Sequence, residues 1–183
     1  LGGAMLWFGW FGFNAGSALG AGPLAANAVL TTQMSAAIGI VGWVLVERYH
    51  RGKPTVLGAV SGGVSGLVAI TPAAGFVTPV AAIPIGFIGA ICCYVAVAIL
   101  KSKVGYDDSL DAFGIHGVGG MWGAIATGLF ATVSVNPDGA DGLFYGGNLL
   151  IPQLISLVVA IALAIIGTTI IFKVVSLFMD MRV

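Results

Sequence analysis

The chain has 183 residues, of which 58% are hydrophobic and only 8% are charged, and its seven basic and seven acidic residues leave no net charge. A soluble domain carries about a quarter charged residues, so this composition excludes an ordinary soluble globule, whose surface it cannot cover with polar side chains. The absence of a basic run or patch also excludes nucleic-acid binding and electrostatic attachment to a membrane surface. We therefore predict an integral membrane protein whose outer surface contacts lipid.

Six apolar stretches with few or no charges are separated by turn-rich or charged segments. Each is close to the length of about 20 residues that a helix needs to cross the hydrocarbon core of a bilayer. We predict transmembrane helices at residues 1–18, 26–46, 54–71, 77–100, 110–133 and 151–179. The expected fold class is an all-α integral membrane protein with six transmembrane helices, and we expect the long last helix to be tilted and to contact lipid or another subunit.

The first predicted helix carries an aromatic and polar stripe. At spacings of three or four residues, on one helix face, lie Trp10, Phe13, Asn14 and Ser17. Aromatic faces attract small cations by about 0.5 to 2 kcal/mol, and a hydroxyl group accepts a hydrogen bond from a cationic amine group. Phe13 and Ser17 therefore suit the capture of a small cation, although an interfacial aromatic belt combined with core packing would give the same pattern.

Glycine occurs 29 times, and two predicted helices repeat it at intervals of four. Gly58, Gly62 and Gly66 lie in the third helix, and Gly119 and Gly123 lie in the fifth. Small residues at this spacing let helix backbones approach closely. We expect both helices to lie inside the bundle.

Acidic residues precede the fifth predicted helix, in the segment 107–117. Carboxylates and hydroxyl groups at such a position cap the exposed backbone N–H groups of the first turn. We expect Asp108 or Ser109 to be the N-cap, and Asp107 to serve the same end. Asp111 is expected one turn deeper, inside the helix, where it is either a further capping residue or a supporting residue of the site.

His116 lies about two turns into the fifth helix, among glycines that leave its imidazole uncluttered. An imidazole donates with one ring nitrogen and accepts with the other, so it can hold a small amine and relay its proton near neutral pH. A satisfied hydrogen bond between helices is the alternative interpretation. No residue with metal-ligand spacing accompanies His116, and the adjacent Cys92 and Cys93 suit core packing rather than a disulfide or a metal site. We expect no metal and no cofactor.

The basic residues fall on one predicted side of the membrane. Three follow the second helix, two follow the fourth and two close the sixth, namely Arg48, Arg51, Lys53, Lys101, Lys103, Lys173 and Arg182. Lys and Arg in short loops are retained in the cytoplasm. We therefore expect the first helix to run outward and the C-terminus to be cytoplasmic.

Two segments, residues 9–17 (Gly-Trp-Phe-Gly-Phe-Asn-Ala-Gly-Ser) and residues 107–117 (Asp-Asp-Ser-Leu-Asp-Ala-Phe-Gly-Ile-His-Gly), closely resemble signatures of the ammonium transporter family, also called Amt/MEP/Rh. Further matches lie at residues 52–55 and 66–75, so the resemblance covers nearly the whole chain. It is stronger to the Amt/MEP branch than to the Rhesus branch.

Members of this family have eleven helices, arranged as two inverted five-helix halves and a final long helix, and they assemble as trimers with one pore per subunit. Inverted repeats with a site between them are a general plan of transporters. The chain resembles helices six to eleven, so residues 1–183 are expected to form the second five-helix repeat and the last helix. The start of the chain inside a helix agrees with the expectation that it is part of a longer protein.

The resemblance also implies roles for particular residues. His116 matches the second histidine of a twin-histidine pair in the pore, Trp10 a pore-lining tryptophan, Phe13 one of two stacked gate phenylalanines, and Ser17 the outer recruitment serine. Asn14 and Asp111 are expected to support them. The absent half would carry the other histidine and the other gate phenylalanine.

The implied function is transmembrane transport of ammonium, captured as NH4+ at an outer vestibule and conducted as NH3 and a proton through an apolar pore. The implied partners are ammonium or ammonia, the lipid bilayer, further copies in a homotrimer, and a PII-type regulatory protein bound through a tail beyond this chain. The implied location is the plasma (cell inner) membrane.

Two other functions fit the same features. An ammonium sensor of the same fold would bind the cation without flux, and a channel for another small neutral solute is open because one histidine and one aromatic gate do not fix the substrate. An enzyme is not expected, because no nucleophile, metal cluster or second titratable group accompanies His116.

Overall fold

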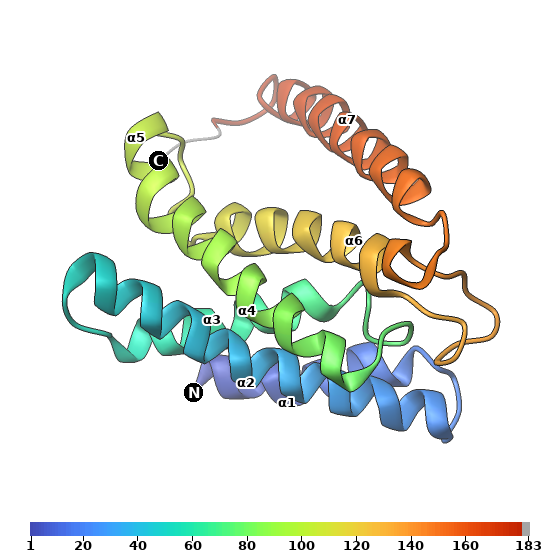
Figure 1. Ribbon diagram of the computed structural model, residues 1–183. Helices are drawn as coiled ribbons and strands as arrows, with labels where there is room; N and C mark the ends of the chain where they lie inside the picture. The colour runs from blue at the N-terminus through green and yellow to red at the C-terminus, as the bar shows by residue number, and fades with distance from the viewer. Residues whose placement is uncertain (181–183) are drawn as a thin grey trace.

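Helices account for most of residues 1–180, the part of the chain that this computed structural model describes, and that part contains no strand. In chain order the helices are α1 (Gly2–Gly16), α2 (Pro23–Arg51), α3 (Val56–Ile70), α4 (Pro79–Val95), η1 (Ala96–Leu100), α5 (Lys101–Val104), η2 (Phe113–Gly117), α6 (Val118–Phe130), η3 (Leu143–Tyr145) and α7 (Leu150–Val175). The π-helical turns η1 and η2 join their neighbours, so that α4, η1 and α5 form one rod and η2 and α6 another (Figure 1). The six predicted helices and the all-α fold class are confirmed.

Helix lengths differ from the prediction at several ends. α2 was expected to end at residue 46 but continues to Arg51, because basic side chains favour the last turn of a helix and only the left-handed Gly52 (φ 79°) ends it. By length and composition, residues 23–51, 79–104 and 150–175 can cross a membrane. α1 and α3 have 15 residues each, or about 22 Å of helix, so each is shorter than a full hydrocarbon core.

The short α3 is followed by a non-helical segment, residues 71–78, whose backbone groups need partners inside the bundle. Asn27 of α2 donates from Nδ2 to the carbonyl oxygens of Ala74 (3.2 Å) and Val77 (3.1 Å). Thr31, one turn further along α2, donates to the Ala74 carbonyl at 3.0 Å. Irregular backbone at membrane depth is tolerated only where protein or water satisfies it, so these side chains of α2 permit the break in α3.

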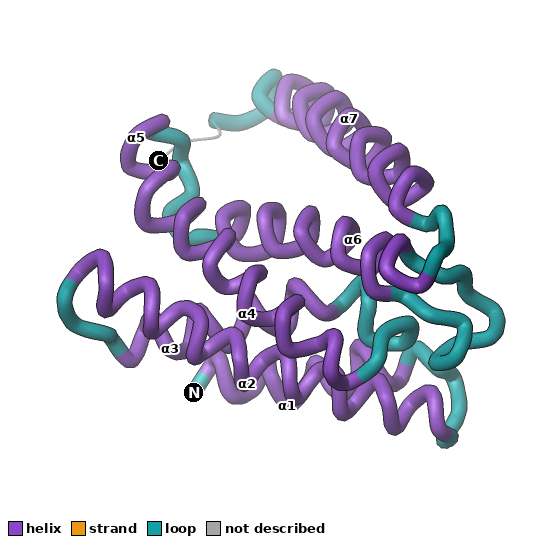
Figure 2. The backbone as a smooth tube through the Cα atoms, in the orientation of Figure 1, coloured by secondary structure: helices purple, strands orange, loops and turns teal. Residues whose placement is uncertain are grey.

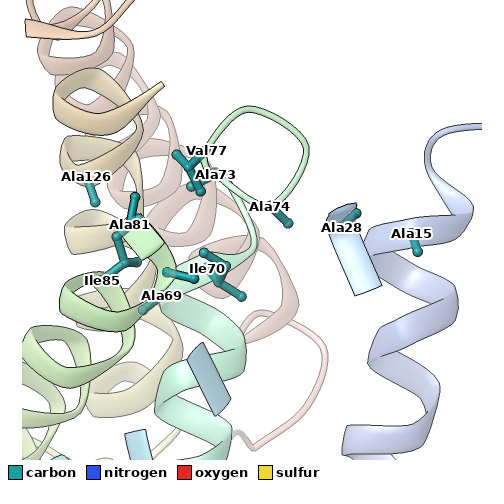
Figure 3. Packing of buried hydrophobic residues seen from close by; sticks show 11 residues of the cluster. Ala15, Ala28, Ala69, Ile70, Ala73, Ala74, Val77, Ala81, Ile85 and Ala126 are labelled. Atoms are coloured by element: carbon teal, nitrogen blue, oxygen red, sulfur yellow. The ribbon is translucent and has the colours of Figure 1, made fainter. Parts of the chain in front are cut away.

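Small residues let α2, α3 and α4 pack at very short range. The core in which α3, α4 and α6 meet is built largely from alanine, as Figure 3 shows, and residues 62–70 of α3 are all buried. Ser35 of α2 donates to the buried carbonyl of Gly66 at 2.7 Å. The glycine spacing therefore predicted correctly that α3 is an inner helix.

α7 stands apart from the other helices in Figures 1 and 2, and none of its residues is buried by the rest of residues 1–180. It contacts the bundle mainly through α6. An apolar helix with no covered face requires lipid or another protein surface around it, which agrees with the expected lipid or subunit contact.

The basic ends of the helices lie together. In Figure 1 the turn after α2, the short α5 and the C-terminal end of α7 occupy one end of the bundle, and the α1–α2 connection and the loops before α4 and α7 occupy the other. Arg48, Arg51, Lys101, Lys103 and Lys173 belong to the first end. Arg182 lies outside the described residues.

We predict that Gly39→Ala destabilises the bundle. A Cβ atom on Gly39 would lie 2.5 Å from the carbonyl oxygen of Gly62 and 3.0 Å from the Cα atom of Gly66, and both are backbone atoms of α3. Because neither can swing away, α2 and α3 would have to separate, which costs about 1 to 3 kcal/mol. Detergent denaturation of the complete gene product measures the loss. Gly20→Ala is the control, since nothing lies within 4 Å of a Cβ there; equal stability of the two variants would contradict the close packing.

We also predict an acid-sensitive cap at the start of η2. The Asp108 carboxylate accepts from the backbone N–H groups of Phe113 (3.2 Å) and Gly114 (3.0 Å), so it caps the first turn as expected, although neither Asp108 nor Ser109 occupies the N-cap position itself. Burial works to raise the pKa of Asp108, but the backbone donors outweigh it and hold the pKa below its ordinary value. The folded state therefore gains stability above the ordinary aspartate pKa and loses it as the pH falls through the lowered one.

Asp108→Asn removes this dependence. From about pH 6 to about pH 3, the free energy of unfolding of the parent should fall more steeply than that of the variant, as detergent denaturation at several pH values would measure. Parallel pH profiles would show that the cap does not depend on the charge of Asp108.

Candidate functional site

A cavity of about 810 Å³ opens along one side of the bundle between α1, the end of α3 and η2–α6. Its lining is mostly apolar and consists of Gly2, Met5, Leu6, Gly9, Trp10, Phe13, Val68, Thr71, Pro72, His116 and Gly120. Three residues predicted from the sequence for a pore, Trp10, Phe13 and His116, thus line one cavity.

The indole of Trp10 lies between the other two rings. It stacks on the His116 imidazole with ring centroids 6.1 Å apart and an interplanar angle of 17°. It meets Phe13 edge to face, with centroids also 6.1 Å apart and planes at 83°. Its Nε1–H donates to the Thr71 hydroxyl at 2.8 Å. One polar contact and two ring contacts therefore fix the orientation of this side chain.

His116 lies in the π-helical turn η2, not in regular α-helix. A π-turn places an extra residue in one helical turn and is frequent at functional sites. The imidazole is exposed, and among residues 1–180 its ring nitrogens have no hydrogen-bond partner. The alternative interpretation, a satisfied hydrogen bond between helices, thus finds no support within the described chain. Both ring nitrogens are available to a small polar ligand.

A second cavity, of about 310 Å³, lies beyond Phe13. Phe13 and Thr71 line both cavities, while Asn14 and Ser17 line only the smaller one. The Ser17 hydroxyl donates to the Phe13 carbonyl at 2.7 Å, so the lone pairs of its oxygen remain as acceptors. Asn14 donates instead to Thr32 of α2 at 2.9 Å, which makes it a tie between α1 and α2.

Asp111 was expected inside the helix, but it lies just before it. It precedes η2 with a left-handed backbone (φ 56°), and its carbonyl accepts the first helical bond, from the N–H of Ile115. Its carboxylate accepts from the Lys101 ammonium at 2.7 Å, with both side chains partly exposed. Lys101 also donates to the Asp108 carbonyl. The prediction of its depth was wrong, because a hydropathy pattern cannot show a left-handed residue; Asp111 instead fixes the turn that starts the His116 helix.

Sequence reasoning missed two partly buried polar contacts. Thr71, the partner of Trp10, stands directly before a proline at the end of α3, which was a visible signal for a helix end with free polar groups. Glu47 was assigned to a loop, but its side chain is only 2% exposed and accepts from both the N–H and the hydroxyl of Thr55, at 3.0 Å each. Glu47 thereby fastens the α2–α3 turn. Within residues 1–180, no group of three or more His, Cys, Asp and Glu side chains is placed to hold a metal ion.

Similarity to solved structures supports the helix arrangement. The fold matches Mep2 of Saccharomyces cerevisiae with a TM-score of 0.91 and 37% identity, over 97% of this chain and 42% of that one. It also matches a protein named Sensor Amt Protein with a TM-score of 0.88 and 30% identity, over all of this chain and 44% of that one.

Sequence similarity agrees with the structural similarity. The chain is 58% identical to an ammonium transporter of Bacillus subtilis and 48% identical to ammonium transporter Amt1 of Archaeoglobus fulgidus, in each case over its whole length. It spans 45% and 46% of these relatives, or about half their length, and they are named as transporters, not enzymes. The family model described as Ammonium Transporter Family matches residues 1–183. The chain is an integral membrane protein that belongs to the ammonium transporter family.

Proposed function

We propose that the complete protein moves ammonium across a membrane and that residues 1–183, its second five-helix repeat and final long helix, supply one side of the pore. The observation that carries this proposal is the convergence of Trp10, Phe13 and His116 on one mostly apolar cavity. Family membership indicates the class of substrate, and the cavity offers that substrate aromatic faces and an imidazole.

Capture begins at the smaller cavity. Ser17 uses its only proton on the Phe13 carbonyl, so toward a ligand its hydroxyl acts as a hydrogen-bond acceptor. Ammonium has only donors to offer, and an acceptor beside an aromatic face suits it. The side chains of Ser17 and Phe13 therefore form a recruitment site for NH4+.

Phe13 then separates recruitment from conduction. It borders both cavities, so a cation that passes it leaves a vestibule with several polar groups for a more apolar lumen and must give up water. The indole face of Trp10 compensates part of that loss. A bare ammonium ion is costly in such surroundings, which favours transfer of its proton before passage.

His116 is the group that handles the proton. Its two nitrogens can accept from NH4+ on one side and donate onward on the other. The parallel indole of Trp10 restricts the direction in which the imidazole faces. Asp111 and Lys101 fix the turn from which its helix starts, and Asn14 fixes α1 against α2.

Orientation and assembly follow from charge and family. The end of the bundle that carries the basic residues faces the cytoplasm under the positive-inside rule, so that the C-terminal end of α7 is cytoplasmic and Ser17 is outside. A plasma membrane location, a homotrimer and regulation by a PII-type protein rest on the family resemblance.

A sensor is the second candidate, because the chain also matches the protein named Sensor Amt Protein over its whole length. The two functions differ in flux. Ammonium binding to the purified complete protein, without ammonium uptake into liposomes that contain it, would identify a sensor. Flux of a neutral solute that ammonium does not compete with would indicate a channel for that solute.

We predict that His116→Ala lowers ammonium uptake by at least about tenfold, since acid–base groups contribute on the order of a hundredfold or more to proton transfer. Uptake into liposomes containing the complete gene product is the measurement. The chain offers a matched control in its other histidine: His50 hydrogen-bonds with Tyr94 at 2.8 Å, outside the cavity, so His50→Ala should leave uptake near the parent value. Unchanged uptake in His116→Ala would refute the role given to His116.

We predict a different signature for Ser17→Ala. Loss of one acceptor at the vestibule should raise the half-saturating ammonium concentration about fivefold, the equivalent of one hydrogen bond, and leave the maximal rate nearly unchanged. Concentration-dependent uptake separates these two constants. Ser176→Ala is the control, because Ser176 also donates only to its own helix but lies at the end of α7. A fall in maximal rate alone would place Ser17 at a later step.

A further inference from the structure

We propose that Thr71 is a positioning residue that sets the selectivity of the cavity by holding the indole of Trp10 in place. Thr71 follows the last residue of α3 and borders both cavities. The inference deepens the proposed function and rests on it where it concerns flux; the link between Thr71 and Trp10 can be tested without flux.

The direction of the hydrogen bonds makes Thr71 an obligatory acceptor. Its hydroxyl donates to the carbonyl of Leu67, four residues back in α3, at 2.8 Å. Because a hydroxyl has one proton, its oxygen must accept the second contact, the Nε1–H of Trp10 at 2.8 Å. Leu67 is fully buried, so the chain of bonds ends on rigid backbone in the centre of the bundle.

Helix α1 needs such a tie. Among its residues only Ala15 is buried, so apolar packing fixes its rotation weakly. Polar bonds join it to its neighbours at Trp7, Trp10 and Asn14, whose partners are Gln33, Thr71 and Thr32. Of these three bonds, only the one from Trp10 holds a ring of the larger cavity.

Loss of the Thr71 acceptor would change the orientation of the Trp10 indole. An indole N–H without a partner in apolar surroundings turns toward water or another acceptor. Rotation would break the stack with His116 and the edge contact with Phe13, which depend on the present angle. The cavity would then discriminate less between ammonium and the larger methylammonium, because the aromatic wall that limits the width of the lumen would no longer be fixed.

The first test observes the indole directly. In the complete gene product labelled with ¹⁵N-tryptophan, the Nε1–H resonance of Trp10 is assigned through its disappearance in Trp10→Phe. Thr71→Val keeps the shape of the side chain but has no acceptor, so this resonance should move and its exchange with water should accelerate. Thr71→Ser keeps the hydroxyl and should restore the parent signal. An unmoved resonance in Thr71→Val would overturn the inference.

The chain provides a matched control at Thr127. This residue also donates to a carbonyl four residues back, that of Gly123 at 2.9 Å, and it lies in α6 away from both cavities. Thr127→Val should therefore leave the Trp10 resonance and uptake unchanged. An equal effect of Thr127→Val and Thr71→Val on the resonance would show a general loss of structure and overturn the specific role of Thr71.

The second test measures selectivity. In liposomes, Thr71→Val should change the ratio of ammonium to methylammonium uptake about fivefold, the equivalent of one lost hydrogen bond, and Thr71→Ser should keep the parent ratio. In a Trp10→Phe background, which lacks the N–H, Thr71→Val should change the ratio no further. A full additional change there would overturn the inference even if the single variant were poorly folded.

The two tests distinguish failure of the proposed transport function from failure of the role given to Thr71. If the parent takes up no ammonium while the Trp10 resonance responds to Thr71 as expected, the proposed transport function is wrong, and with it the selectivity role, but the link between the two residues holds. If the parent transports and the resonance moves while the ratio stays constant, transport holds and only the selectivity role is overturned.

Discussion

The need to satisfy every backbone polar group in the bilayer governs this structure. At residues 71–78 the chain leaves the helix within the bundle, and Asn27 and Thr31 of α2 donate to the carbonyl oxygens of the buried Ala74 and Val77, which would otherwise lack a hydrogen-bond partner. Close packing of α2 on α3, through residues without side-chain bulk, brings those donors within reach. A longer and regular α3 would need no such help, but it would continue its backbone hydrogen bonds through Thr71 and leave no break beside the cavity.

The same constraint links the fold to the candidate site. The break places the Thr71 hydroxyl at the end of α3, where it donates backward to Leu67 and accepts from Trp10. The indole in turn lies against His116. One continuous chain of contacts therefore runs from the buried backbone of α3 through Thr71 and Trp10 to the His116 ring, which faces the cavity.

Much of the architecture could be predicted from the sequence, because apolar length and the alternation of basic loops report directly on the membrane. The spacing of Trp10 and Phe13 likewise predicted a shared face. Asn14 shows the limit of that reasoning: it follows Phe13 directly, and its amide bonds to Thr32, where a helical wheel cannot locate a partner. The π-turn at His116 and the left-handed backbone of Asp111 could not be predicted from the sequence either. Both are set by local backbone geometry, for which the residue types in this segment give no signal.

The larger cavity is open on one side, where it exposes side chains of its lining. His116 and Phe13 are exposed in this chain, yet an ionisable imidazole is costly against lipid. Hydrocarbon is therefore a poor covering for this face, whereas protein or confined water is a good one. The two exposed surfaces therefore differ in kind: the cavity presents an ionisable imidazole, whereas α7 presents a largely apolar surface that is suited to lipid.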